Sequence, residues 1–169
     1  MWPAVASPVV VGDMVIVCHG RNDRGDPRLH GVRLSGSGDV TATNHVWTRD
    51  DVSAFVPTPA VYQGCLYLVR DGGQIECLDP MTGETLWSDA FPKSRGKFYA
   101  SPLIASGLLF APREDGVVFV ASVNKDRFDL LSENALEQQV IGSPVPAHDR
   151  LLIRGQSDLF CLGSPVSED

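Results

Sequence analysis

The sequence has no long apolar run, no basic run and few cysteines, and each absence excludes a class of protein. Its longest apolar stretch, VASPVVVG, is too short to span a bilayer. The 14 lysines and arginines are outnumbered by 21 aspartates and glutamates, and the net charge of −7 argues against binding to nucleic acid or to an anionic membrane surface. The opening residues, MWPAVASPVVVGD, lack the charged start and the full apolar core of a signal peptide. We therefore expect no nucleic-acid partner and no membrane insertion.

The spacing of the cysteines and histidines does not predict a metal site. The cysteines are Cys18, Cys65, Cys77 and Cys161, and no two of them form a CxxC pair. A hairpin turn at Asp71 would place Cys77 opposite a residue near Leu68 rather than opposite Cys65, so we expect buried free thiols and no disulfide. The four histidines, His19, His30, His45 and His148, are scattered and show neither HxH nor HExxH spacing.

A fourfold repeat is the main feature that the sequence does contain. Ser-Pro or Thr-Pro pairs recur with their prolines 51, 43 and 42 residues apart, at Pro8, Pro59, Pro102 and Pro144. After each proline come a turn former, an alternating apolar strand, a second turn and a second strand. The best helix candidate, SENALEQQ at 132–139, is expected to be a loop or a single turn. Short strands at about 40–45 residues per unit are typical of β-propeller blades.

We therefore predict an all-β fold, a β-propeller of four-stranded antiparallel blades. About four blades are expected, and the last one is incomplete because its unit stops before an outermost strand. We expect a single propeller segment over residues 1–166, with a disordered tail at 164–169. The expected units span about 7–50, 58–92, 101–138 and 143–163.

The stretch CLDPMTGETLW, residues 77–87, places a tryptophan four residues after a turn glycine. The outermost strand of a blade must dock on its neighbour, and a large flat side chain at this point can cover the seam. We therefore interpret Trp87 as a packing residue, and Trp47 as its counterpart in the first unit. The alternative is that Trp87 stacks on a ligand.

This stretch resembles the tryptophan-docking motif of PQQ-type β-propeller repeats, A-L-D-x-x-T-G-x-x-x-W. With SPVVVGDMVIV and TPAVYQGCLYLV, it makes the chain similar, over about residues 5–163, to the PQQ-like repeat family that includes the outer-membrane assembly lipoprotein BamB. The motif is complete only in the second unit, and the third unit has lost both the glycine and the tryptophan. The resemblance implies these blade-docking residues: Asp79, Thr82, Gly83, Trp87 and Trp47.

The resemblance also raises the question of how the propeller closes. In closed propellers of this kind the N-terminal segment usually supplies the last outer strand, but only Met1 to Ala6 precede the first unit. An open arc would leave two apolar blade faces uncovered. We consider three solutions: a C-terminal part of a larger propeller, which we favour because the chain begins almost directly in a strand, two copies meeting as half-rings, or four blades closing alone.

The chemistry of PQQ-dependent dehydrogenases is not expected here. If the resemblance extended to these enzymes, it would imply a quinone at the propeller axis. It would also imply a catalytic carboxylate, a calcium ion, a stacking tryptophan and in many cases adjacent cysteines. This sequence has no Cys-Cys pair and no matching acidic cluster, and it contains no GxSxG, GxGxxG or P-loop motif. The loop 22–26 lacks the spacing of a calcium loop, and the basic cluster 93–97 is interpreted as a solvated connection. We predict no catalytic residue, no metal ligand and no cofactor.

The function that we predict is that of a non-catalytic scaffold for protein interaction or assembly. Its partners would be another protein or the remaining blades of a larger propeller, with a homodimer as one arrangement. One alternative is a module of a quinoprotein oxidoreductase. Another is a carbohydrate- or peptide-binding propeller with exposed aromatic side chains, for which the candidates are Phe55, Phe91, Phe98 and Tyr99. Relatives are usually exported, often to the periplasm, although no signal peptide is visible in this chain.

Overall fold

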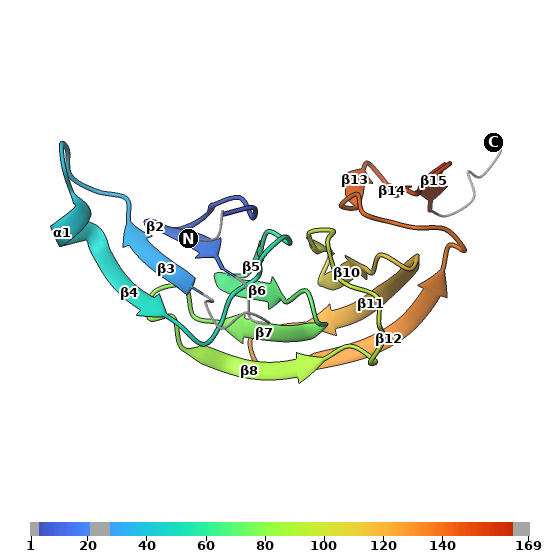
Figure 1. Cartoon of the computed structure of the whole chain (residues 1–169), viewed down its shortest axis with the longest axis horizontal. Coiled ribbons are helices and arrows are strands. Elements are labelled where there is room, and N and C mark those ends of the chain that lie inside the picture. The colour runs from blue at the N-terminus through green and yellow to red at the C-terminus, as the bar shows by residue number, and fades with distance from the viewer. Residues whose placement is uncertain (1–3, 21–27, 164–169) are drawn as a thin grey trace.

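The structure, a computed structural model, describes residues 4–20 and 28–163. It contains four antiparallel sheets that follow one another along an arc, each formed by consecutive strands (Figure 1). Blade 1 consists of β1 (Val9–Val11), β2 (Met14–His19), β3 (Arg28–Arg33) and β4 (His45–Arg49). Blade 2 consists of β5 (Ala60–Tyr62), β6 (Cys65–Val69), β7 (Gln74–Leu78) and β8 (Thr85–Ala90). The predicted propeller architecture is confirmed.

The second half of the chain repeats this arrangement with one strand fewer. Blade 3 consists of β9 (Leu103–Ala105), β10 (Leu108–Pro112), β11 (Val117–Val123) and β12 (Phe128–Ala135). Blade 4 consists of β13 (Val145–Ala147), β14 (Arg150–Arg154) and β15 (Leu159–Leu162). Within each sheet the first strand lies on the concave side of the arc and the last on the convex side (Figure 1). The tail expected at 164–169 lies outside the described residues.

One local expectation was wrong in part. The stretch Ser132–Ala135, expected as a loop or turn, belongs to the long strand β12, because β11 offers it partners from Val120 to Val117. Pairing across the sheet therefore overrides the weak helical preference of this stretch. A short helix, α1 (Thr41–Asn44), lies in the connection before β4, where the Asn44 side chain donates a hydrogen bond to the carbonyl of Arg33 at 2.9 Å.

The core lies in the seams between blades, because side chains alternate between the two faces of each strand. Met14, Ile16 and Cys18 of blade 1 pack on Leu66 and Leu68 of blade 2. The next seam is richer in aromatic rings, and its buried members include Tyr67, Phe91, Phe98 and Phe119. Between blades 3 and 4 the fully enclosed cluster shrinks to Val118, Val140 and Ile153. The packing thus thins toward the C-terminal end of the arc.

The Ser/Thr-Pro repeat has a structural explanation. The backbone N–H of Ser7 donates to the hydroxyl of Thr58, that of Thr58 to the hydroxyl of Ser101, and that of Ser101 to the hydroxyl of Ser143, each at 2.9 Å. Each blade is thereby linked to the next by an identical hydrogen bond. We call this row of four residues the Ser/Thr ladder. It requires a hydroxyl side chain at the same place in every unit, and the sequence provides one.

All four cysteines are free, as expected. Cys18, Cys65 and Cys77 are buried in seams, and burial raises the pKa of the Cys18 and Cys77 thiols to about 12. Cys161, expected to be buried, is exposed, because it lies on the outward face of the last blade. In the described parts of the chain, no helix has the length and apolar character needed to cross a membrane.

Candidate functional site

The first seam is covered by the ring of Trp47, which reaches from blade 1 to the turn after β7 in blade 2. Its indole N–H donates to the carbonyl of Pro80 at 3.0 Å. The ring lies against Gly31 of its own blade and Gly83 of the next, and a Cβ added at Gly83 would come within 2.7 Å of the ring atoms. Gly83 also has φ +75°, a conformation that favours glycine. Gly83 is therefore required both by the turn and by the ring that packs on it.

Asp79 and Thr82 shape this turn and do not touch the tryptophan in any contact that the structure records. Asp79 accepts a hydrogen bond from the Met81 N–H through its Oδ1 at 2.7 Å, and its own carbonyl accepts from the Gly83 N–H at 2.8 Å. The Thr82 hydroxyl accepts from the Glu84 N–H at 3.2 Å. We propose that the two side chains hold the turn in the shape that receives Trp47.

Trp87 makes the equivalent contact across the second seam. Its N–H donates to the carbonyl of Asn124 in blade 3 at 2.9 Å. Its half-buried ring lies 6.0 Å from Tyr67 on its own blade and 6.2 Å from Phe128 on the next, measured between ring centroids. We propose a blade-docking role for both tryptophans on these contacts. The turn of blade 3 lacks the glycine, yet it still presents a carbonyl to the ring.

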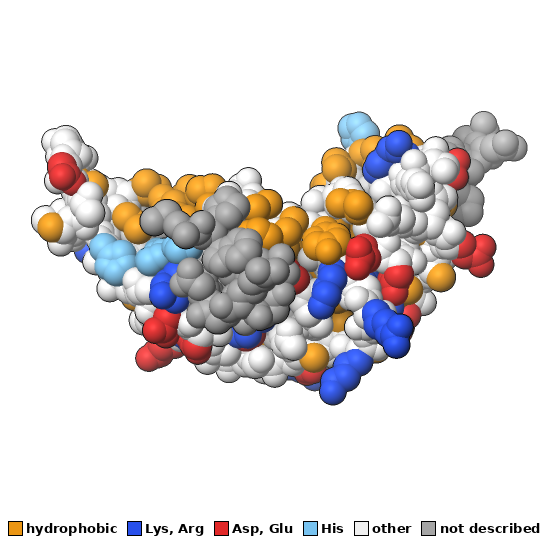
Figure 2. All heavy atoms as spheres, in the orientation of Figure 1, with side chains coloured by type: hydrophobic (Ala, Val, Ile, Leu, Met, Phe, Trp, Pro, Cys, Tyr) orange, Lys and Arg blue, Asp and Glu red, His pale blue; other side chains and the backbone are white. Residues whose placement is uncertain are grey.

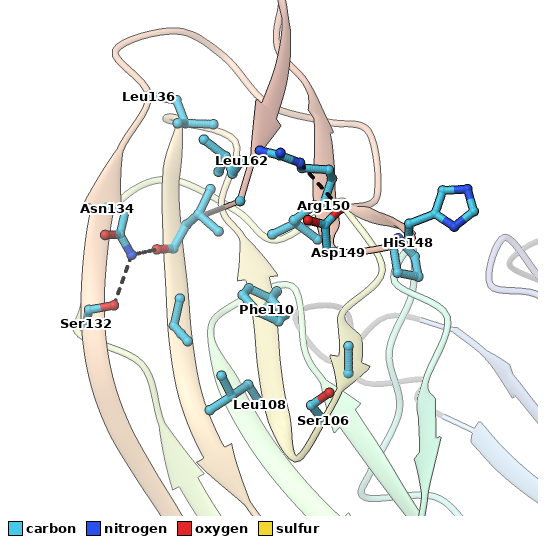
Figure 3. Close-up of a pocket in the computed structure, with 16 residues that line it drawn as sticks. Ser106, Leu108, Phe110, Ser132, Asn134, Leu136, His148, Asp149, Arg150 and Leu162 are labelled. Carbon is cyan, nitrogen blue, oxygen red and sulfur yellow. Dashed lines mark hydrogen bonds and ion pairs between the residues drawn. The ribbon is translucent and has the colours of Figure 1, made fainter. Parts of the chain in front are cut away.

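The third seam contains a cavity of about 530 Å³ instead of a tryptophan. Figure 3 shows Leu108 and Phe110 on one side of it and Arg150 and Leu162, from blade 4, on another. Asn134 lies at its edge on β12 and donates to the Ser132 hydroxyl at 3.0 Å and to the Val118 carbonyl at 3.2 Å (Figure 3). The cavity is of the size that small molecules occupy, with mostly apolar walls and a few polar side chains.

An ion pair between half-buried Arg70 and buried Glu76 lies on the face of blade 2 that meets blade 1. Burial raises the pKa of Glu76, although the Arg70 guanidinium opposes that shift. Glu76 lies across the sheet from Leu68, and in blade 1 His30 lies across from Val17 in the same way. The position that carries the ion pair in blade 2 therefore carries histidines in blade 1.

Three of the histidines come together there, which their scattered places in the sequence did not predict. His19 and His30 stack with their Nε2 atoms 3.2 Å apart, and the other ring nitrogen of His30 faces His45 Nε2 at 3.5 Å. Because His30 presents a different nitrogen to each neighbour, the three do not converge on one point, and no metal-holding group is found among the described residues. Burial, His19, His45 and Arg28 lower the pKa of His30.

The outer faces of blades 1 and 4 form the two ends of the arc. We call the apolar outward side chains of blade 1 the first end face: Val10, Val15, Val17 and Val32. We call those of blade 4 the last end face: Val145, Leu152, Leu159 and Cys161. Val10, Val145 and Leu159 are 59%, 52% and 63% exposed. Figure 2 shows apolar side chains gathered along the concave side of the arc and charged ones along its convex side.

The other side chains considered from sequence are placed as follows. Phe91 and Phe98, proposed as exposed aromatics, are buried and stack with centroids 5.1 Å apart, because they fill the second seam. Phe55 and Tyr99 are half-buried. The charged residues of the basic connection 93–97 are exposed, as expected of a solvated loop. The loop 22–26 lies outside the described residues.

Antiparallel blades follow one another along the arc, and a ladder bond joins each to the next. Tryptophans cover two of the seams. These features together define a β-propeller repeat protein. A family model described as outer membrane protein assembly factor BamB matches residues 3–89 and 36–128. The chain therefore belongs to the BamB-type, PQQ-like repeat family.

Individual relatives carry several different names. Tetrathionate hydrolase of Acidianus ambivalens is 32% identical over 103 residues, which cover 53% of this chain and 19% of that protein. BamB of Moraxella catarrhalis has a TM-score of 0.69 at 16% identity, over 96% of this chain and 46% of its own. A europium-containing methanol dehydrogenase has a TM-score of 0.58 at 16% identity, over 82% of this chain and 25% of its own. The chain thus spans less than half the length of each, and the two structures share its fold.

Proposed function

We propose that the chain is a non-catalytic propeller scaffold whose two end faces pack on further blades of the same kind. In a solution of this chain alone, a second copy supplies those blades. The two copies meet head to tail, so that blade 4 of each packs on blade 1 of the other. Such an arrangement has twofold symmetry and closes without leaving a free end.

The observation that carries this proposal is the Ser/Thr ladder. In each seam the N–H of the earlier blade donates to the hydroxyl of the later one. Within the described residues the ladder stops at both ends, because neither the N–H of Ser143 nor the hydroxyl of Ser7 has a recorded partner. Ser143 of one copy can therefore donate to Ser7 of the next and continue the ladder around a ring.

The end faces support the same arrangement. Val17 and Leu159 lie at the positions that Leu68 and Leu29 hold in the first seam, and those two leucines belong to one buried cluster. Joining the two ends would remove exposed apolar side chains from water, which is the main favourable term in protein association. The chain covers 46% of a BamB structure, so two copies approach the length of that protein.

The tryptophans favour a scaffold over an enzyme of the quinone-dependent kind. Trp47 and Trp87, the side chains that could stack on a cofactor, are held in seams by hydrogen bonds to Pro80 and Asn124. Their rings contribute to cohesion between blades. The alternative function as an oxidoreductase module gains no support from the described side chains.

A charge-pair mixing experiment tests the proposal. Val17→Glu and Leu159→Lys each place a charge in both junctions of a homodimer, so each variant alone should be monomeric by light scattering. When the two are mixed, one junction pairs the opposite charges and the other is unmodified, so a heterodimer should form. Leu86→Glu, at an exposed position on the middle of the arc, is the matched control and should leave assembly unchanged. Unmodified chain that stays monomeric, or a mixture that stays monomeric, would overturn the proposal.

A further inference from the structure

The cavity in the third seam occupies the place of a missing tryptophan. In blade 1, Trp47 lies directly across from Gly31 and next to a β-bulge, and in blade 2, Trp87 lies across from Cys77 in the same way. In blade 3 the residue across from Val120 is Ser132, again beside a bulge. Ser132 therefore holds the register position of the two tryptophans.

The neighbours of this position are also equivalent. Across blade 2 a row runs from Tyr67 through Cys77 to Trp87, and the rings of Tyr67 and Trp87 lie close together. Across blade 3 the corresponding row runs from Phe110 through Val120 to Ser132. Phe110, Val120 and Ser132 all line the cavity. Blade 3 therefore has an aromatic ring, Phe110, at the position of Tyr67, but it has no ring at the position of Trp87.

We propose that this cavity binds a small planar aromatic molecule of about the size of indole, which lies over Phe110 as Trp87 lies beside Tyr67. Ring–ring contacts of this kind add to the gain from apolar burial. Leu108, Leu151 and Leu162 supply further apolar wall from both blades. The ligand bridges blades 3 and 4 as the tryptophans bridge the other seams.

Arg150 is one of the polar side chains that line the site, with Ser132, Asn134, His148 and Asp149. Its guanidinium group forms an ion pair with Asp149 at 3.4 Å and lies on the blade 4 side of the cavity (Figure 3). A guanidinium beside an aromatic ring attracts the electron-rich face of that ring. The site therefore favours an electron-rich ring over a saturated ring of equal size.

Calorimetric titration with indole tests the inference. We expect saturable binding of one indole per chain. We also expect cyclohexanol, which has no aromatic face, to bind at least tenfold more weakly than phenol, an aromatic molecule of equal size. Ser132→Trp fills the cavity with a covalent ring and should weaken indole binding at least tenfold. Ser88→Trp, at an exposed position on the outer strand of blade 2, is the matched control and should bind indole like the unmodified chain.

Two further variants test whether a loss of indole binding comes from misfolding or from a change in assembly. Ser132→Leu fills the cavity in part and serves if Ser132→Trp does not fold, as judged by circular dichroism. The monomeric Val17→Glu variant should bind indole unchanged, because the cavity lies within one copy, so this result is independent of the scaffold proposal. No saturable binding to the unmodified chain, or binding that survives both substitutions at Ser132, would overturn the inference.

Discussion

At the scale of single residues, the seams depend on rings that span two blades and on glycines that make room for them. Trp87→Ala should lower the free energy of unfolding by about 2–4 kcal/mol, because it removes a half-buried ring and its hydrogen bond to Asn124. Leu86→Ala, next to it but 46% exposed, should cost under about 1 kcal/mol. Urea unfolding of both variants checks this, and equal losses would mean that the ring does not hold the seam.

A comparison of two glycines with the same backbone angle separates the cost of backbone strain from the cost of a clash with the Trp47 ring. Gly64 and Gly83 both have φ +75°, but a Cβ at Gly64 meets nothing within 4 Å, whereas one at Gly83 meets Trp47. Gly64→Ala should therefore cost only the conformational penalty, about 1 kcal/mol. Gly83→Ala should cost at least about 1 kcal/mol more, because the ring must move. Thermal unfolding measures both, and equal costs would place Trp47 away from Gly83.

At the scale of elements, the histidines on strands β2, β3 and β4 should make blade 1 sensitive to acid. The folded chain lowers the pKa of His30 below its ordinary value of 6.5, so the unfolded chain binds the proton more readily. The stability that this neutral histidine contributes is present above pH 6.5 and is lost as the pH falls through its folded value.

The Leu159→Lys monomer allows this dependence to be measured without assembly. Its free energy of unfolding should fall between pH 7 and pH 5, and His30→Gln should make the dependence shallower. His148→Asn, at an exposed turn of blade 4, should leave it unchanged. A His30→Gln profile identical to that of the parent would remove His30 as the cause.

The elements differ in how far the sequence could predict them. The Ser/Thr-Pro spacing and the alternating strands predicted the blades, because a repeat places the same turn chemistry in each unit. The second half of strand β12 was missed, because Ser132–Ala135 lack β propensity and are ordered by pairing with β11. The histidine cluster depends on the register of three strands, which spacing along the chain does not reveal. The cavity did have a signal, since the third unit visibly lacks a tryptophan.

At the scale of the whole molecule, each blade is joined to the next by the same hydrogen bond and by apolar packing, but among the described residues the two ends of the arc lack such a neighbour. Every seam carries a ladder bond, and the first and last blades present apolar side chains with no further blade in the described chain to cover them. The same rule applied once more at each end would produce a closed ring. The contacts that join neighbouring blades within the arc would then also bind the partner copy.

The mass of the unmodified chain in solution, measured by light scattering on a sizing column, tests this most directly. The account predicts a discrete particle of twice the 18.3 kDa mass of one chain. It also predicts that Ser7→Ala, which removes the acceptor for the last ladder bond, shifts the equilibrium toward the monomer. A compact monomer over the whole accessible concentration range would contradict the account, because the arc would then be complete without further blades.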